Sequence, residues 1–465
     1  PVCNDVTLRM MLIIWLVLDL DQGQMDVETA FLEGHLPEST RIFMKTPEGM
    51  DRQIQSDECL EIKKGMYGLV QASRLYFLKF AKYMTEELGF RQCPSEQCLF
   101  LKWGKKSIML LATYVDDSII FGHKDDINDF FESIEIFKIK HEDKLNDFLG
   151  VNIIRSVEKD KVWLMQPHLI KSLVSEWGER FKNKRCPVTP GTPNQSFIKV
   201  SREEDMVPIS DKEHKIYQSV VGKLLYLLKH SRPELSNCVR EVSKAMKIAG
   251  EKHVKEVIRI LTFILHNPNQ ALFVKPESTL KNPTIEEIKE FEWEIDGMSD
   301  STWANKTEEG HSIAGWIIRI MGALAGWGCR QIKHITLSTA ESEYAAALEM
   351  VKELQFVKNM MEWMGLKVKL PMKIYLDNQA AIMMIRNNYT TVGSRHCSLR
   401  VWYLRDLYMK GIIDPIYVKS EENISDILTK NTTRELFEKH SLKMVENVPP
   451  EYLTQKLEEA EIEHG

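Results

Sequence analysis

Two adjacent aspartates interrupt an apolar stretch and are the residues that point most directly to chemistry. Asp116 and Asp117 stand between an apolar run, 108–115, and a second one, 118–121. This pattern predicts strand, tight turn and strand, with the carboxylates at the tip. Two neighbouring ionised carboxylates repel each other unless a cation compensates, and oxygen ligands suit Mg²⁺. The alternative is ordinary turn chemistry, because Asp is favoured in hairpin loops.

A two-metal site for phosphoryl transfer needs more ligands than one turn supplies, so a third carboxylate is required. Asp26 is the candidate, because it lies where a predicted strand gives way to a turn or helix within residues 24–32.

A second set of acidic residues lies in the later half of the chain. Asp300 is predicted at the end of one strand, Asp377 at the end of another, over 373–378, and Asp426 at the start of a later helix. A long amphipathic helix is predicted to begin near Leu337 and to end at Gly365.

Two glutamates near the start of that helix can be separated by a capping argument. Ser338 and Glu341 form a capping-box pattern, so Glu341 is expected to turn back to the helix start. Glu343, further along, is then free to point at Asp300 and Asp377. Glu341 remains the alternate.

These motifs resemble a known family. The segment around Asp26 resembles the first catalytic motif of reverse transcriptases of the Ty1/copia class of retrotransposons, and residues 64–77 resemble its Tyr-Gly-Leu-Lys-Gln-Ala-Pro-Arg segment. Residues 148–152 resemble the motif that supports the primer strand, with a helix-to-strand turn at Gly150 as the compatible structural interpretation. The order of the later acidic residues resembles the ribonuclease H fold.

The resemblance implies the roles of individual residues. Phe31 matches the position where an aromatic ring fills the space of a ribose 2′-hydroxyl, with an ordinary core residue as the alternative. Val70 and Ser73 stand where the family has Lys and Pro, so we expect weaker nucleotide binding. The residues implied to bind nucleotide are Phe31, Gln71, Arg74 and Tyr114. The residues implied to be catalytic and to hold metal are Asp26, Asp116, Asp117, Asp300, Glu343, Asp377 and Asp426.

The implied cofactor is Mg²⁺, two ions per active site. The implied partners are an RNA template, a DNA primer, RNA/DNA hybrid and deoxynucleoside triphosphates. Ser398 replaces an Asp of the family in residues 394–400, and His396 there is either a substrate contact or a packed surface residue. Thr302 and Asn305 also depart from the family pattern, in a loop next to Asp300.

Composition sets outer limits on these expectations. The chain has 465 residues, of which 43% are hydrophobic, so it can form two to four domains with real cores. Eight cysteines without Cys-x-x-Cys spacing indicate neither a zinc site nor a disulfide framework. A net charge of −6 gives no global signal for nucleic acid. The apolar run 10–18 is too short to span a bilayer and predicts a buried helix.

The predicted fold class is an α+β polymerase palm with partial fingers, a helical thumb or connection, and an α/β ribonuclease H-like domain. We assign 1–185 to the fingers and palm, 186–290 to a linker and the thumb or connection, 291–433 to the ribonuclease H-like domain and 434–465 to a charged carboxyl-terminal tail with a solvated helix. Residues 281–292 read as a charged spacer. Further helices are predicted at 69–88, 124–136, 217–233, 235–248 and 252–266, and further strands at 97–103, 160–166, 314–319 and 323–328.

The expected function is RNA-directed DNA polymerisation with ribonuclease H activity. A remnant that binds nucleic acid without polymerising is the rival, favoured by Val70 and Ser73 and opposed by the complete set of carboxylates. The chain begins with Pro and without the family's basic stretch, so we expect impaired polymerisation. We expect an intracellular location, cytoplasmic in a virus-like particle with passage into the nucleus left open, and no membrane partner. Oligomeric state is open.

Overall fold

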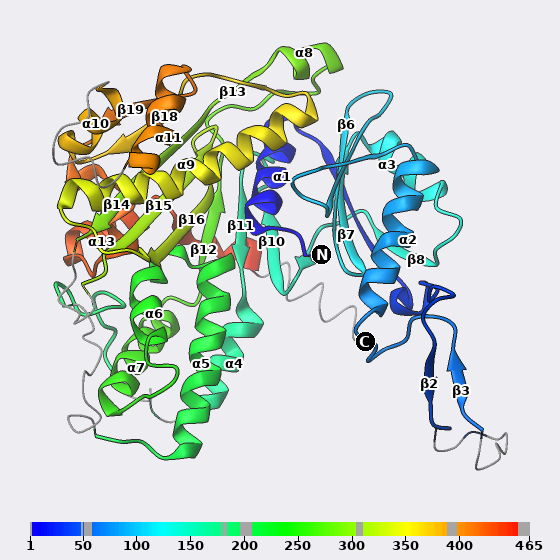
Figure 1. Cartoon of the computed structure of the whole chain (residues 1–465), viewed down its shortest axis with the longest axis horizontal. Helices are drawn as coiled ribbons and strands as arrows, with labels where there is room; N and C mark the ends of the chain where they lie inside the picture. The colour runs from blue at the N-terminus through cyan, green and yellow to red at the C-terminus, as the bar shows by residue number, and fades with distance from the viewer. Residues whose placement is uncertain are drawn as a thin grey trace. The chain divides into compact units, whose positions relative to one another are not determined.

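The computed structural model describes residues 2–47, 50, 58–177, 180, 184–195, 207–303, 310–387 and 398–453. Its contacts group the chain into two compact units, described in turn (Figure 1). The first comprises Pro1–Met11, Leu18–Leu145 and Lys281–Ile288, and the second comprises Leu12–Val17, Asn146–Leu280 and Lys289–Gly465. Within these described ranges, no helix is both long and apolar enough to cross a membrane.

The first unit is built on a six-stranded sheet in which every neighbouring pair of strands is antiparallel, in the order β4-β5-β6-β7-β1-β8. Its strands are β1 (Asp21–Val27), β4 (Arg91–Gln92), β5 (Leu99–Trp103), β6 (Ile108–Tyr114), β7 (Asp117–Gly122) and β8 (Ile139–Glu142). A separate hairpin pairs β2 (Ile42–Met44) with β3 (Leu60–Ile62). Consecutive residues of β6 and β7 are buried, which indicates that both faces of the sheet centre are covered.

The helices that lie wholly within this unit are η1 (Ala30–Leu32), α2 (Ala72–Glu86) and α3 (Lys124–Glu132). The apolar spacing of α3 buries Ile127, Phe130 and Phe131, and the helix contacts β1 and β7. Phe131 lies so close to β1 that a Cβ added at Gly23 would be 2.9 Å from its ring. The helix therefore covers one face of the strand that carries Asp26.

Helix α1 (Asp5–Val17) confirms the predicted buried helix, since no side chain over 10–18 is more than 1% exposed.

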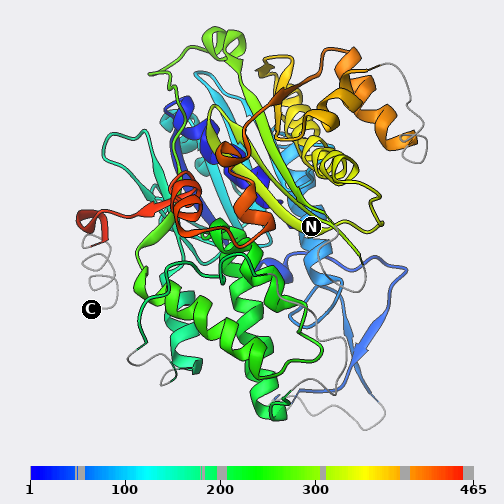
Figure 2. The same cartoon turned by 90° about the vertical axis from the view of Figure 1, so that its left-hand side faces the viewer.

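The second unit contains two five-stranded sheets. The first is antiparallel in the order β20-β12-β11-β10-β9. Its strands are β9 (Asp147–Phe148), β10 (Val151–Arg155), β11 (Val162–Met165), β12 (Gln270–Val274) and β20 (Val445–Asn447). Four α-helices lie between β11 and β12 along the chain: α4 (Pro167–Trp177), α5 (Asp211–His230), α6 (Ser236–Ser243) and α7 (Glu251–His266). The short helix η4 (Pro233–Leu235) lies between α5 and α6. Helices α5, α6 and α7 lie side by side and are green in Figures 1 and 2.

The second sheet has the order β16-β15-β14-β18-β19 and mixes strand directions. Its strands are β14 (Ile295–Thr302), β15 (Ile313–Ile320), β16 (Ala323–Gln331), β18 (Met372–Leu376) and β19 (Ile413–Tyr417). The pairs on the β15 side are antiparallel, whereas β14, β18 and β19 run parallel. This sheet lies within residues 291–433, the range for which the sequence predicted an α/β domain.

The helices around this sheet are α9 (Thr339–Met364), α10 (Gln379–Arg386), α11 (Ser398–Met409), α12 (Asp426–Thr429) and α13 (Arg434–Ser441), with η6 (Ser420–Glu422) and the parallel pair β13 (Glu292–Trp293) and β17 (Lys367–Val368). Helix α9 packs across β14 and β15 (Figure 1). A Cβ at Gly297 of β14 would meet the Met350 sulfur of α9 at 2.7 Å, whereas one at Gly315 of β15 would meet Thr429 of α12 at 2.6 Å. Both glycines thus permit close helix-to-sheet contact.

Three local expectations need correction. Gly150 sits at a turn between two strands, β9 and β10, rather than between a helix and a strand, and its φ of +67° suits glycine. The predicted spacer contains helix α8 (Ile285–Glu290) and strand β13.

The segment after residue 434 is not a solvated helix throughout. Helix α13 buries Phe437 and His440, and β20 pairs with β12 as an edge strand of the first sheet of the second unit. The apolar residues of β20 are too few and too interspersed with charges to show a strand period in the sequence.

Candidate active sites

The hairpin of the first unit carries adjacent carboxylates at its tip. Val115 and Asp116 form the turn between β6 and β7, and Asp117 is the first residue of β7. Val115 has a φ of +61°, a conformation that β-branched residues rarely adopt. Such strain persists only where the surroundings impose it, and it is concentrated at functional sites.

Strand β1 brings the third carboxylate to this turn. Asp26 lies directly opposite Asp117 in the β1–β7 pairing, and the Val27 amide donates to the Asp116 carbonyl at 3.2 Å. Burial raises the pKa of Asp26, and the negative charge of Asp116 adds to this, while Lys140 on the neighbouring strand opposes it. The structure thus brings Asp26, Asp116 and Asp117 to one end of the sheet.

The residues implied to bind nucleotide lie on η1, on the start of α2 and at the end of β6, all in the first unit. The Phe31 and Tyr67 rings meet edge to face, with centroids 5.3 Å apart and an interplanar angle of 88°. Gln71 is the N-cap residue of α2 and Arg74 lies in its first turn, both exposed, and η1, which carries Phe31, packs against α2. Tyr114 ends β6 and pairs with Asp117.

Close backbone packing fixes the loop that carries Phe31. The Gly65 amide donates to the Gly34 carbonyl at 2.7 Å, and a Cβ at Gly65 would lie 2.4 Å from the Phe31 carbonyl oxygen. The sequence motif contained Tyr67, but only the tertiary structure shows that its ring contacts Phe31.

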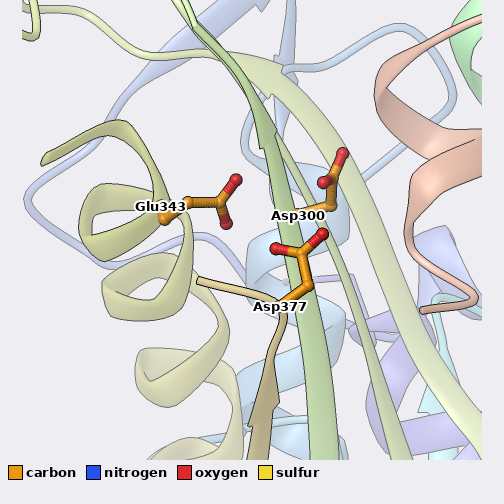
Figure 3. A group of neighbouring side chains, drawn as sticks. All are labelled: Asp300, Glu343 and Asp377. Carbon is orange, nitrogen blue, oxygen red and sulfur yellow. The ribbon is translucent and has the colours of Figure 1, made fainter. Parts of the chain in front are cut away.

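In the second unit, three acidic side chains converge at one edge of the mixed sheet (Figure 3). Asp300 lies near the end of β14 and Asp377 directly follows β18, and these two strands are parallel neighbours, so their carboxyl ends meet at the same edge. Glu343 reaches them from the first turns of α9. One carboxylate oxygen of each residue lies within 4.8 Å of the others, and this is the one such group of three potential metal ligands among the described residues.

The start of α9 has the geometry that the capping argument predicted. The Ser338 hydroxyl accepts from the Glu341 amide at 3.2 Å, and the Glu341 carboxylate accepts from the Leu337 amide at 2.7 Å. Glu341 therefore serves the helix start, and Glu343 is the glutamate that joins the cluster.

Neighbouring polar groups hold the three carboxylates in place. Glu343 Oε1 accepts from the Ser301 amide at 3.1 Å and from its hydroxyl at 3.0 Å. Asp377 Oδ2 accepts from the Ser420 hydroxyl at 2.7 Å, and Asp300 Oδ2 accepts from the Thr429 hydroxyl. No sequence signal indicated these partners, because each is distant along the chain or lies on another element.

Asp426 lies beside Asp300 but outside the group of three. It is the first residue of α12 and is buried, and the Lys430 ammonium lies 3.0 Å from its Oδ1 and 3.7 Å from Asp300 Oδ1. Burial raises the pKa of Asp426, and Lys430 opposes that rise. Sequence reasoning did not identify Lys430, although its spacing of four residues from Asp426 is a recognised ion-pair signal.

The electrostatics of the cluster fit a divalent cation. Burial, reinforced by the charge of Asp377, raises the pKa of Glu343 to about 8, and burial with the charge of Asp426 raises that of Asp300. Within the described part of the chain, the buried Glu343 Oε2 has no hydrogen-bond partner. Buried carboxylate oxygens that repel one another are the donor set that Mg²⁺ or Ca²⁺ accepts.

Some predicted site residues lie outside the described ranges. These are His396 and Asn305, so neither is placed here. Thr302 is described, and its hydroxyl donates to the Thr429 carbonyl at 3.4 Å.

Comparison with known proteins gives one family match. Residues 1–188 match the family described as reverse transcriptase (RNA-dependent DNA polymerase). The chain is 28% identical over 449 residues to the retrovirus-related Pol polyprotein from transposon TNT 1-94 of Nicotiana tabacum, covering 94% of this chain and 32% of the relative. It is 25% identical over 453 residues to that from transposon RE1 of Arabidopsis thaliana, covering 97% of this chain and 29% of the relative.

Among solved structures, a foamy viral protease-reverse transcriptase in complex with RNA/DNA hybrid is similar with a TM-score of 0.44 and 12% identity, covering 88% of this chain and 45% of that chain. The chain spans about a third of the length of the Pol polyproteins it matches. Residues 1–188 thus match the reverse transcriptase family, and nearly the whole chain is similar to part of the Pol polyproteins of two plant transposons.

Proposed function

We propose that the chain is an RNA-directed DNA polymerase joined to a ribonuclease H that cuts the RNA strand of RNA/DNA hybrids. The observation that carries the proposal is the convergence of Asp300, Glu343 and Asp377 within 4.8 Å, in a chain whose first 188 residues match the reverse transcriptase family. The opposition of Asp26 and Asp117 in the β1–β7 pairing supports the polymerase half.

In the polymerase half, Asp26, Asp116 and Asp117 would hold two Mg²⁺ ions. Phe31 would exclude a ribose 2′-hydroxyl with its ring, and the contact with the Tyr67 ring would keep the Phe31 ring in place. Gln71, Arg74 and Tyr114 would contact the incoming deoxynucleoside triphosphate. An RNA template and a DNA primer are the corresponding partners.

In the nuclease half, Asp300, Glu343, Asp377 and Asp426 would hold two Mg²⁺ ions. Ser301 and Ser420 orient Glu343 and Asp377 through the hydrogen bonds described above. When bound, the metal ions of the two sites supply charge stabilisation at the reacting phosphate and activation of the attacking hydroxyl or water.

A specific observation favours a second candidate, a catalytically impaired remnant that binds nucleic acid. Val70 is 91% exposed next to Gln71, so an apolar side chain faces solvent where the family places a lysine. A missing cation beside a triphosphate lowers its affinity, because phosphate binding depends strongly on positive charge.

Two assays on the same sample of this chain test the proposal. We expect extension of a DNA primer on an RNA template and cleavage of an RNA/DNA hybrid, both dependent on Mg²⁺. Asp116→Asn should abolish extension and spare cleavage, and Asp377→Asn should do the reverse.

The matched control is Asp125→Asn, an exposed aspartate in α3 that pairs with Lys106 at 2.6 Å, and it should change neither activity. Extension that survives in Asp116→Asn would contradict the polymerase assignment. Binding of hybrid without either activity would favour the remnant.

A further inference from the structure

The Lys430 ammonium lies between two carboxylates of the nuclease cluster. Its Nζ is 3.0 Å from Asp426 Oδ1 and 3.7 Å from Asp300 Oδ1, and both aspartates are buried. A lysine ammonium and a metal ion bind the same kind of oxygen ligand. Lys430 therefore occupies the place where a cation shared by Asp300 and Asp426 would bind.

Among the described residues, no lysine or arginine forms an ion pair with the other two carboxylates of the cluster, Glu343 and Asp377. Glu343 Oε1 accepts from Ser301, and Asp377 Oδ2 accepts from the Ser420 hydroxyl. With Asp300, these residues form the group of three oxygens that converge within 4.8 Å, which does not include Asp426. Asp300, Glu343 and Asp377 can thus bind a divalent ion, whereas the charge at Asp426 is already neutralised in part by Lys430.

We propose that Lys430 is a built-in counter-ion at the second cation position of the nuclease site. The first divalent ion binds at Asp300, Glu343 and Asp377 with the ammonium in place, and the second binds only by displacing it. This inference rests on the proposed nuclease function. The physical basis is repulsion between like charges. The ammonium lies 3.0 and 3.7 Å from two buried carboxylate oxygens, and a divalent ion bound to the same oxygens would be strongly repelled by it.

The structure leaves room for the displaced side chain. A cavity of about 410 Å³ borders the cluster and is lined in part by Lys430, Asp426, Thr302, Asn237 and Asn431. The Lys430 side chain is 43% exposed, whereas that of Asp426 is 5% exposed. The ammonium can therefore swing into this cavity while the aspartates stay in place.

Mn²⁺ binding to the full chain tests the proposal, with free Mn²⁺ measured by electron paramagnetic resonance. An Asp116→Asn, Asp117→Asn background removes two carboxylates of the polymerase site so that the nuclease site is observed. We expect one tight and one weaker binding event. Lys430→Met should tighten the weaker event on the order of tenfold, which corresponds to about 1.4 kcal/mol, and leave the tight one unchanged.

Two further variants separate this role from others. Lys430→Arg retains the positive charge and should keep the second event weak. Lys439→Met is the matched control, because it removes a lysine that pairs with Glu422 at 2.5 Å in the same unit, and it should leave both events unchanged. If Lys430→Met does not fold, as judged by circular dichroism, Lys430→Gln replaces it.

The second Mn²⁺ event decides the outcome. If Lys430→Met leaves it unchanged or weakens it while hybrid cleavage persists in the parent chain, the counter-ion proposal is overturned and the nuclease function stands. Loss of hybrid affinity with unaltered Mn²⁺ binding would make Lys430 a substrate contact and also overturn it. Absence of both Mn²⁺ binding and cleavage in the parent chain would overturn the nuclease function itself.

Discussion

Replacing Glu343 by Gln should stabilise the metal-free protein at alkaline pH. The folded-state pKa of Glu343 is raised to about 8, first by burial and then by the charge of Asp377. In the unfolded chain the carboxyl has its ordinary value of 4.5. Between these two pKa values the unfolded state releases a proton that the folded state retains. The free energy of unfolding is therefore not reduced by this carboxyl below pH 4.5, and it falls as the pH rises from 4.5 towards 8.

The size of the effect follows from the same two values. One pKa unit corresponds to about 1.4 kcal/mol, so the interval from 4.5 to about 8 amounts to roughly 4–5 kcal/mol. Because part of the shift comes from the charge of Asp377, which the substitution also relieves, we expect Glu343→Gln to recover about 2 kcal/mol. For a unit of this size, this is roughly 3 °C in unfolding temperature.

The glutamine should fit the site. Its carbonyl oxygen can keep the hydrogen bonds from the Ser301 amide and hydroxyl, at 3.1 and 3.0 Å in the parent chain. The amide nitrogen of the glutamine then replaces Glu343 Oε2, which has no hydrogen-bond partner among the described residues. This nitrogen can donate towards the carboxylates of Asp300 and Asp377.

The assay is thermal unfolding in chelator at pH 5 and pH 8, followed by circular dichroism, and repeated with Mn²⁺. Glu343→Gln should unfold at a higher temperature than the parent at pH 8, with a smaller difference at pH 5, and should gain less from Mn²⁺. Glu362→Gln, on the exposed face of α9, is the control and should shift little at either pH. An equal shift at both pH values, or none at pH 8, would refute the reasoning.

Two further substitutions test other parts of the structure. Gly65→Ala should lower primer extension about tenfold and leave hybrid cleavage intact, because its Cβ would clash with the Phe31 carbonyl oxygen. Gly222→Ala is the control, because its Cβ meets nothing within 4 Å. Equal losses of primer extension in the two variants would contradict the prediction. Asn423→Ala should destabilise the second unit by about 2–3 kcal/mol in denaturant unfolding. The buried Asn423 side-chain amide donates to the Ser299 carbonyl at 2.8 Å, and its oxygen accepts from the Ser425 hydroxyl at 2.6 Å. A change under about 0.5 kcal/mol would argue against a stabilising role for these hydrogen bonds.

Much of the secondary structure could be predicted from local patterns. The apolar runs on either side of Asp116 and Asp117 predicted β6 and β7, and the capping box predicted the start of α9. These features depend on residues close together in the sequence, whose spacing fixes the local hydrogen bonds and the buried face. The end of the chain was misjudged because β20 depends on its partner β12, about 170 positions earlier.

By itself, the sequence determined which acidic residues stand at the ends of strands and helices, and their order along the chain. Tertiary structure decided which of them meet. Strand register sets Asp26 opposite Asp117, and the parallel pairing of β14 with β18 brings Asp300 and Asp377 to one edge. The contacts of Lys430 and Ser420 with the cluster depend on packing between elements far apart in the sequence, and no local pattern encodes such packing.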